Sequence, residues 1–176
     1  MKKNDTMSEI SKYGIRKIDT PLGILYAISS KNGIIKMTLK KQIENDSIGK
    51  IHLNKTEEWF KSYFNGEEIE RPFLDYQEMT VFRKGVLNKL TEEIKFGKII
   101  SYSKLASLLN NVGATMAVGT ALAKNPWPII IPCHRVVNSD GKIGNYSGIR
   151  GIIGKKILLK HEGLNISDNK ILINIP

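Results

Sequence analysis

The sequence predicts an α+β fold, with a small N-terminal domain of β-sheet and helix at residues 1–78 and a mostly helical domain at residues 79–176. Three patterns predict it. Apolar runs on both sides of Asn32-Gly33 indicate a β-hairpin, and apolar residues from Thr80 onward keep helical spacing. The 176 residues, 41% of them hydrophobic, suffice for the cores of two small domains.

The N-terminal domain is expected to hold the hairpin, one helix and a linker. The hairpin should run from Gly23 to Leu39, because Asn-Gly tolerates the positive φ angles of a tight turn. Thr56 can cap a short helix that Asn65-Gly66 ends, and the aromatic side chains of this helix share one face, which predicts core. The acid-rich residues 67–77 indicate a linker. With no catalytic constellation in this domain, we expect it to have a supporting role.

The second domain is expected to begin with a helix that Thr80 caps and that continues to about Gly97. A short helix capped by Ser103 is followed by a turn at 110–113 and by another helix over about 114–124. Two short helices joined by an Asn/Gly turn are typical of a helix-turn-helix, expected here in its winged form, whose second helix would enter a groove of DNA.

The helix at 114–124 carries small and nearly uncharged residues. Such residues suit close approach to a narrow minor groove better than the reading of base edges in the major groove. We therefore expect double-stranded DNA as the partner, bound in the minor groove with little sequence specificity. The residues predicted to contact it are Thr115, Met116, Ala117, Gly119 and, beyond this helix, Arg135.

The formal net charge of +10 belongs mainly to the second domain. Residues 1–78 hold 13 basic and 12 acidic residues, whereas the remainder holds 14 basic and 5 acidic ones. A domain that faces a polyanion is expected to show such an excess, although a solvated basic face would give the same count. We find no apolar stretch of a signal peptide near the N-terminus and no apolar run of roughly 18 residues. We expect a cytoplasmic protein that makes no membrane contact and acts as a monomer.

Cys133 is the only cysteine, which excludes an intrachain disulfide and zinc sites built on several cysteines. We expect neither a metal nor a cofactor. An apolar strand within 126–137 would deliver Cys133, and His134 and Arg135 follow it. A thiol is nucleophilic as the thiolate, and a neighbouring base or cation favours that form. The alternative is a buried structural thiol, since free cysteine is among the most buried residue types.

The string Pro-Cys-His-Arg-Val-Val at 132–137 closely resembles the active-site motif of the O6-alkylguanine-DNA alkyltransferases, the methylated-DNA–protein-cysteine methyltransferases. Over about residues 80–163, further similar stretches follow in the family order: Ile100–Tyr102, Ala117–Gly119, Asn125-Pro126, Gly144–Gly148 and Leu158–Gly163. The N-terminal domain is similar only through Thr20–Gly23 and the hairpin after it.

This resemblance implies a DNA repair protein that flips an O6-alkylated guanine out of the duplex and takes the alkyl group irreversibly onto Cys133. It implies that Glu162 holds His134, which activates the thiol through a water, and that Tyr102 donates to the leaving guanine. Asn125 resembles the hinge asparagine of the family. The remaining implied roles are in substrate binding and fall on Pro128, the Val136 carbonyl, the loop of Tyr146 and Ser147, and Lys155, with Lys156 as its alternative.

Two features depart from the family pattern. Met116 stands where the family usually has an arginine that replaces the flipped base in the stack. Methionine can act as an apolar wedge, but it lacks the charge and hydrogen bonds of arginine. The stretch Gly148–Gly154 is also about two residues longer than usual, which can alter the rim of the pocket.

Three other functions compete with alkyl transfer. An alkyltransferase-like protein senses damaged bases without repairing them, but such relatives lack the active cysteine. A helix-turn-helix regulator with a structural cysteine needs base-reading side chains, which the helix at 114–124 does not offer. A cysteine hydrolase turns over and needs a further histidine with a fitting partner, and only His161 is available downstream. The sequence therefore favours the alkyltransferase.

Overall fold

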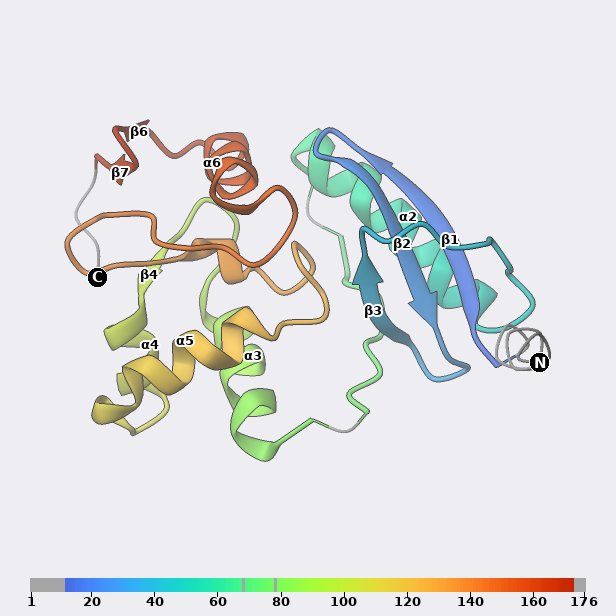
Figure 1. Cartoon of the computed structure of the whole chain (residues 1–176), viewed down its shortest axis with the longest axis horizontal. Helices are drawn as coiled ribbons and strands as arrows, with labels where there is room; N and C mark the ends of the chain where they lie inside the picture. Colours follow the sequence, from blue (N-terminus) through green and yellow to red (C-terminus); the bar gives the residue numbers. More distant parts are fainter. Residues whose placement is uncertain (1–11, 68, 78, 173–176) are drawn as a thin grey trace, which may run out of the picture. The chain divides into compact units, whose positions relative to one another are not determined.

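The computed structural model describes residues 12–67, 69–77 and 79–172. The chain divides into two compact units, Met1–Gln77 and Glu78–Pro176 (Figure 1). The described residues of the first unit form an antiparallel sheet with one helix, and those of the second are mostly helical, so the predicted α+β class is confirmed. No helix within the described ranges has the length and apolarity that crossing a bilayer requires.

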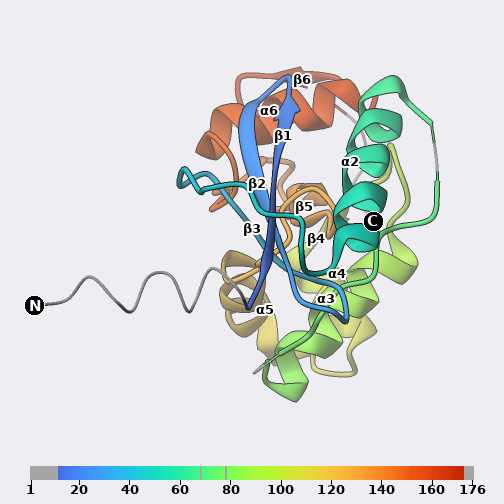
Figure 2. The same cartoon turned by 90° about the vertical axis from the view of Figure 1, so that its right-hand side faces the viewer.

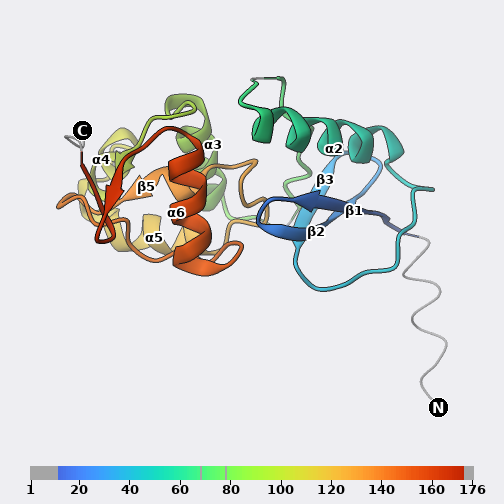
Figure 3. The same ribbon diagram turned by 90° about the horizontal axis from the view of Figure 1, so that it is seen from above.

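The first unit is a three-stranded antiparallel sheet with a helix across one face (Figure 3). Its elements are β1 (Gly14–Thr20), β2 (Gly23–Ser29), β3 (Ile34–Thr38) and α2 (Lys50–Asn65). The predicted hairpin is confirmed as β2 and β3, and β1, which we did not predict, pairs with the whole of β2. Gly33 is required because a Cβ there would lie 2.7 Å from the carbonyl oxygen of Phe73.

Helix α2 ends where the sequence predicts but begins earlier. After Asn65, Gly66 adopts a left-handed conformation (φ 77°) and its N–H donates to the carbonyl of Tyr63. The predicted cap at Thr56 is wrong, since Thr56 is buried inside the helix and its hydroxyl donates to the carbonyl of His52 at 2.7 Å. A threonine hydroxyl can accept from a backbone N–H at the start of a helix or donate to a carbonyl inside it, and the sequence pattern does not distinguish these two positions.

The segment predicted as a linker adds to the edge of this sheet. The Ile34 N–H donates to the Phe73 carbonyl at 2.8 Å, and the Asp75 N–H donates to the Ile34 carbonyl at 2.9 Å. The Ser30 hydroxyl also donates to the Asp75 carboxylate. Residues 73–75 therefore belong to the first unit's sheet rather than to a free connection.

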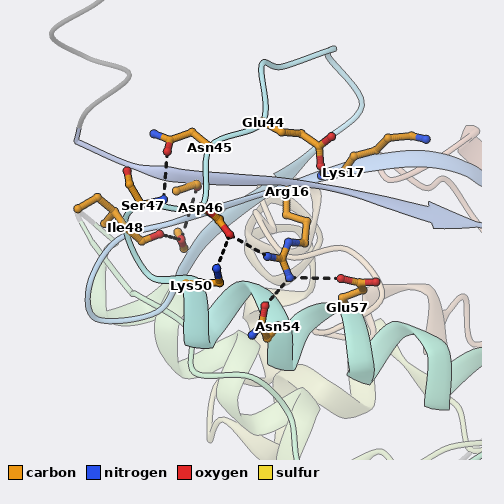
Figure 4. Close-up of polar contacts among 12 residues, drawn as sticks. Arg16, Lys17, Glu44, Asn45, Asp46, Ser47, Ile48, Lys50, Asn54 and Glu57 are labelled. Carbon is orange, nitrogen blue, oxygen red and sulfur yellow. Dashed lines mark hydrogen bonds and ion pairs between the residues drawn. The ribbon is translucent and has the colours of Figure 1, made fainter.

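A polar network joins β1 to α2 and to the loop before it (Figure 4). The Arg16 guanidinium lies 3.3 Å from Glu57 Oε2 and 3.7 Å from Asp46 Oδ2, and it donates to Asn54. Lys50 pairs with Asp46 at 2.9 Å. Because the acidic partners are partly open to solvent, the network orients α2 on the sheet more than it stabilises the fold.

The second unit contains four α-helices among its described residues, with short strands and 3-10 turns between them. Helices α3, α4 and α5 lie together, α6 lies apart from them, and the segment 125–137 runs between the two groups (Figures 1 and 2). Strand β4 pairs in parallel with β5, and β6 pairs antiparallel with β7. The elements are α3 (Val81–Glu93), β4 (Ile100–Ser101), α4 (Tyr102–Leu108), the 3-10 turn η1 (Val112–Ala114), α5 (Thr115–Ala123), the 3-10 turn η2 (Cys133–Arg135), β5 (Val136–Val137), α6 (Gly151–His161), β6 (Ile166–Ser167) and β7 (Lys170–Ile171).

Helices α4 and α5, joined through η1, form the predicted pair of short helices. Thr80 caps α3 as predicted, since its hydroxyl accepts from the Arg83 N–H at 3.3 Å. The cap predicted at Ser103 is wrong: Ser101 caps α4, accepting from the Lys104 N–H at 3.1 Å. Either serine suits a cap, and the pairing of β4 with the distant β5 decides where the helix begins.

Candidate active site

The segment before the cysteine is a packed irregular loop, not the apolar strand that the sequence predicts. Its three prolines remove N–H donors that a strand would need. Ile129 has a left-handed φ of 76°, which is rare for a β-branched residue. Trp127 and the three isoleucines after it are buried. The loop is therefore part of the core, which holds the position of Cys133.

The side chain of Asn125 supplies the hydrogen bonds that this loop lacks. Its Nδ2 donates to the Ile131 carbonyl at 2.9 Å and to Cys133 Sγ at 3.1 Å. Its Oδ1 accepts from the Trp127 N–H at 3.0 Å. Asn125 thus connects the end of α5 to the cysteine sulfur directly.

Cys133 is the first residue of η2 and is only 6% exposed. Burial raises the pKa of its thiol, and the hydrogen bond from Asn125 and the charge of Lys155 offset only part of this effect. At neutral pH the sulfur is therefore a thiol, which needs a base before it can act as a nucleophile.

The imidazole of His134 is completely buried against the carboxylate of Glu162, with Nε2 2.7 Å from Oε1. Burial lowers the pKa of His134 although Glu162 opposes this shift, so we assign a neutral ring. A carboxylate can only accept, so Nε2 carries the proton and Nδ1 is an acceptor. Among the described residues, Nδ1 has no hydrogen-bond partner, which leaves it available as a base.

Arg135 lies against Glu162 and is only 8% exposed. Its Nε donates to Glu162 Oε2 at 2.8 Å and its Nη2 donates to Oε1 at 3.0 Å, while Nη1 donates to the Ile94 carbonyl at 2.8 Å. A guanidinium held inside in this way does not reach a phosphate, so the DNA contact predicted for Arg135 is corrected. Burial disfavours the charged form of Glu162, but His134 and Arg135 outweigh it and lower the pKa of the carboxyl to about 2.

Lys155 is completely buried in the core of the second unit, whereas Lys156 is only half-buried. The Lys155 Nζ donates to the Val136 carbonyl at 2.6 Å and lies 6.0 Å from the centre of the Tyr102 ring. Burial lowers the pKa of Lys155 to about 8, against the opposite effect of the Cys133 thiolate. Lys155 thereby fixes the carbonyl that was predicted to bind substrate and places a positive charge near the sulfur.

A cavity of about 650 Å³ opens onto Cys133, a size common for small-ligand sites. The predicted site residues that line it are Tyr102, Met116, Gly119, Cys133, Tyr146 and Ser147. Thr115 lines a neighbouring cavity of about 580 Å³, whereas Ala117 and Pro128 line neither. The lining residues that sequence reasoning missed are Thr120, Leu122, Ala123, Asn138, Gly144 and Asn145. Of these, Gly144 and Asn145 lie in a similar stretch, and Asn138 gave no signal.

Two tyrosines contribute buried phenols to this cavity. Burial, and then the charge of the Cys133 thiolate, raise the pKa of both Tyr102 and Tyr146, so both remain donors. The Tyr146 hydroxyl has no hydrogen-bond partner in the described part of the chain. Its ring lies against Gly148, where a Cβ would sit 2.3 Å from Tyr146 Cζ, so any larger residue at this position would displace the Tyr146 ring. The Ser147 hydroxyl donates to the Ala123 carbonyl at 2.9 Å and ties the loop to α5.

Met116 stands at the rim of the cavity with 87% of its surface exposed. It lies in the first turn of α5, whose buried residues are Val118, Ala121 and Leu122. Ala117 is also exposed, so the free face of α5 carries small or apolar side chains and no charge. Such a face can approach a flat or narrow surface closely.

A buried cysteine with a histidine–glutamate pair behind it, lining a cavity beside the helix pair α4 and α5, is the arrangement of a protein whose thiol acts as a nucleophile. The curated methylated-DNA–protein-cysteine methyltransferase of Homo sapiens is 39% identical over 164 residues, covering 83% of this chain and 78% of that protein. The protein of the same name from Sulfolobus acidocaldarius is 35% identical over 156 residues, covering 88% and 94%. This chain belongs to the methylated-DNA–protein-cysteine methyltransferase family.

Two further comparisons agree with this membership. Residues 81–164 match the family described as 6-O-methylguanine DNA methyltransferase, DNA binding domain. The crystal structure of the Mycobacterium tuberculosis OGT in complex with DNA is similar with a TM-score of 0.72 and 32% identity, covering 85% of this chain and 92% of that one. The second unit therefore contains the matched domain together with the cavity and Cys133.

Proposed function

We propose that this chain is a DNA repair protein that takes the alkyl group from O6 of an alkylated guanine onto Cys133, once per molecule. The bond from Sγ to the alkyl carbon forms as the bond from that carbon to O6 breaks. The thiol proton leaves toward His134, and the guanine is restored by taking up a proton. The position of Cys133 at the foot of the cavity, with His134 and Glu162 behind it, carries this proposal.

The proton path uses the free nitrogen of His134. Nδ1 is unprotonated and points away from Glu162, so it can accept the thiol proton through one bridging water. Glu162 then stabilises the imidazolium, because its hydrogen bond to Nε2 strengthens as the ring becomes charged. The thiolate therefore forms only as His134 takes the proton during alkyl transfer, since burial otherwise keeps Cys133 protonated.

The leaving guanine is expected to meet donors as charge develops on it. Tyr102 retains its phenolic proton and can donate to the base, and the backbone amide of Ser147 can donate to O6. The carbonyls of Cys133 and Val136 would accept from the guanine amino group. Lys155 keeps the Val136 carbonyl in place through its 2.6 Å hydrogen bond.

We expect α5 to lie in the minor groove of the DNA, and the protein to bind with little sequence specificity. The exposed face of this helix is free of charge, so the phosphates must be met by basic residues elsewhere in the second unit, which carries nearly the whole charge excess. A base must leave the stack before a protein nucleophile can reach O6 in line. Met116, exposed at the cavity rim, would fill the space that the base vacates. We expect a monomer to be sufficient, with the first unit in a supporting role.

Replacing Met116 by arginine is expected to tighten binding to lesion duplex by about tenfold, because a guanidinium adds charge-assisted hydrogen bonds that a thioether cannot make. Fluorescence anisotropy with a labelled duplex measures this change. The matched control is Ile51→Arg, which adds the same charge to an exposed position of the first unit and should leave affinity nearly unchanged. Equal affinity of Met116→Arg and the original chain would contradict the proposed position of residue 116 in the DNA.

The proposed function is tested by titrating a duplex that holds one O6-methylguanine with increasing protein. Nucleoside chromatography follows the lesion, and we expect one lesion to disappear for each chain added until one equivalent of protein has removed them all. When DNA is in excess, repair should stop once every chain has reacted. Continued turnover would indicate an enzyme of another kind. Persistence of the lesion at any protein concentration would refute the transfer reaction.

A further inference from the structure

The buried ion pair between Arg135 and Glu162 has no place yet in the proposed chemistry. Arg135 does not line the cavity, and its guanidinium covers Glu162 through two hydrogen bonds of 2.8 and 3.0 Å. Glu162 also accepts from the backbone N–H of Gly97 at 3.1 Å. The same carboxylate holds His134, so any change in its charge balance acts on the proposed base.

We propose that Arg135 is a positioning residue for the transfer reaction, because its guanidinium balances the charge of Glu162 and so keeps His134 neutral with Nδ1 ready to accept a proton. This inference rests on the proposed function of Cys133. It assigns to Arg135 a role inside the protein in place of the DNA contact that its position in the sequence suggested.

The carboxylate of Glu162 affects His134 differently with and without the guanidinium beside it. Burial disfavours the imidazolium form of His134, but a lone carboxylate 2.7 Å away would favour it, since the pair would then be neutral in a medium that solvates charge poorly. With the guanidinium present, the carboxylate is already neutralised, and a second cation at His134 would leave a net charge in the core. The neutral form of His134 is therefore favoured beside the Arg135–Glu162 pair, and only a neutral ring can accept the thiol proton.

The groups around His134 agree with this reading. Arg135 and Cys133 flank it on η2, while Glu162 and Lys155 come from α6 and its end, and Lys155 adds a second positive charge. From the α3–β4 connection come the Ile94 carbonyl and the Phe96 ring, which lies 6.0 Å from the Arg135 guanidinium carbon. His161 packs edge-on against the same ring at 5.8 Å. Glu162 is the one anionic carboxylate near His134 among these groups, and Arg135 covers it.

Arg135 is therefore held in one place by two segments, the α3–β4 connection and the end of α6. The carbonyl of Ile94 fixes Nη1, Phe96 lies beside the guanidinium, and Glu162 takes Nε and Nη2. A lysine could supply the charge but not the planar pair of donors that meets both carboxylate oxygens. This difference makes Arg135→Lys and Arg135→Gln a matched pair, because the first keeps the charge and the second removes it.

The test reads the charge of His134 directly by NMR of ¹⁵N-histidine-labelled full-length protein, titrated from pH 5 to 8. In the original chain we expect the resonances of His134 to show a neutral ring with its proton on Nε2 over most of this range. In Arg135→Gln the ring should become imidazolium at a pH higher by on the order of one to two units, the size of an uncompensated charge a few ångströms away. Arg135→Lys should shift this pH much less. In Arg135→Gln the pH below which the rate of transfer falls should rise by the same one to two units.

The control is Arg150→Gln, which removes the same charge from an exposed position of the second unit and should leave His134 neutral. A His134 that is imidazolium at pH 7 in the original chain would overturn the proposal, and this measurement needs no variant to fold. A folded Arg135→Gln variant whose His134 becomes imidazolium at the same pH as in the original chain would also overturn it. Because the NMR titration does not depend on alkyl transfer, its failure is distinct from a failure of the proposed function, which the unmodified chain tests with methylated DNA.

Discussion

Replacing Cys133 by serine is expected to reduce alkyl transfer to the level of buffer alone while the protein still binds DNA. A serine hydroxyl is a far weaker nucleophile at neutral pH than a thiol with a base beside it. The hydrogen bond from Asn125 can be made to the serine oxygen instead of the sulfur, so the loop should keep its shape. Transfer is measured by loss of O6-methylguanine from a duplex, and binding by fluorescence anisotropy.

The binding measurement should be repeated over a range of salt concentrations. For both the original chain and Cys133→Ser, affinity should fall steeply and with the same slope, because phosphate neutralisation releases counterions and does not involve the cysteine. Loss of both transfer and binding in Cys133→Ser would mean that the cysteine has a structural role. A flat salt response would contradict the assignment of the basic second unit to DNA.

Replacing Glu162 by glutamine is expected to lower the free energy of unfolding at pH 7 by about 3 kcal/mol, because it leaves the Arg135 guanidinium buried without a counter-charge. The pKa of Glu162 is depressed from 4.5 to about 2. Its contribution to stability is therefore fully present above about pH 4.5 and is lost as the pH falls toward 2. The difference between the two proteins should shrink over that interval.

Urea unfolding followed by circular dichroism at several pH values measures this difference. The matched control is Glu93→Gln, since Glu93 is an exposed residue at the end of α3 with only a 3.4 Å contact to Lys89, and it should change stability by less than about 0.5 kcal/mol. Glu162→Gln should also slow transfer by on the order of 100-fold or more at pH 7, because His134 loses the carboxylate that orients it, and a positioned base contributes roughly 10²–10⁴-fold. A stability difference that stays constant down to pH 2 would contradict the ionised buried pair.

Local signals in the sequence predict much of this fold, and they fail where distant residues decide. Asn32-Gly33 marks the hairpin and Gly66 marks the end of α2, because turns and helix ends depend on neighbouring residues. The start of α4 depends instead on the pairing of β4 with β5, and residues 73–75 join a sheet edge formed some forty residues earlier. The local secondary-structure propensities of residues do not reveal pairing between segments that lie far apart in the sequence.

The candidate site shows the same division. Cys133, His134 and Glu162 stand in strings specific enough to be found by resemblance, and the structure brings them together. The orientation of Arg135 could not be predicted, since a basic residue beside a reactive cysteine fits an exposed phosphate contact as well as a buried ion pair. Asn138 lines the cavity although no local pattern singles it out, because folding alone brings it there.

The central claim is that Cys133 itself receives the alkyl group, and intact mass spectrometry followed by peptide mapping tests it most directly. After incubation with excess duplex containing O6-methylguanine, every chain should gain the mass of one CH₂, and the peptide that contains Cys133 should carry it. The duplex should lose one lesion for each modified chain. An unmodified chain while the lesion disappears, or a methyl group on any other residue, would contradict the account.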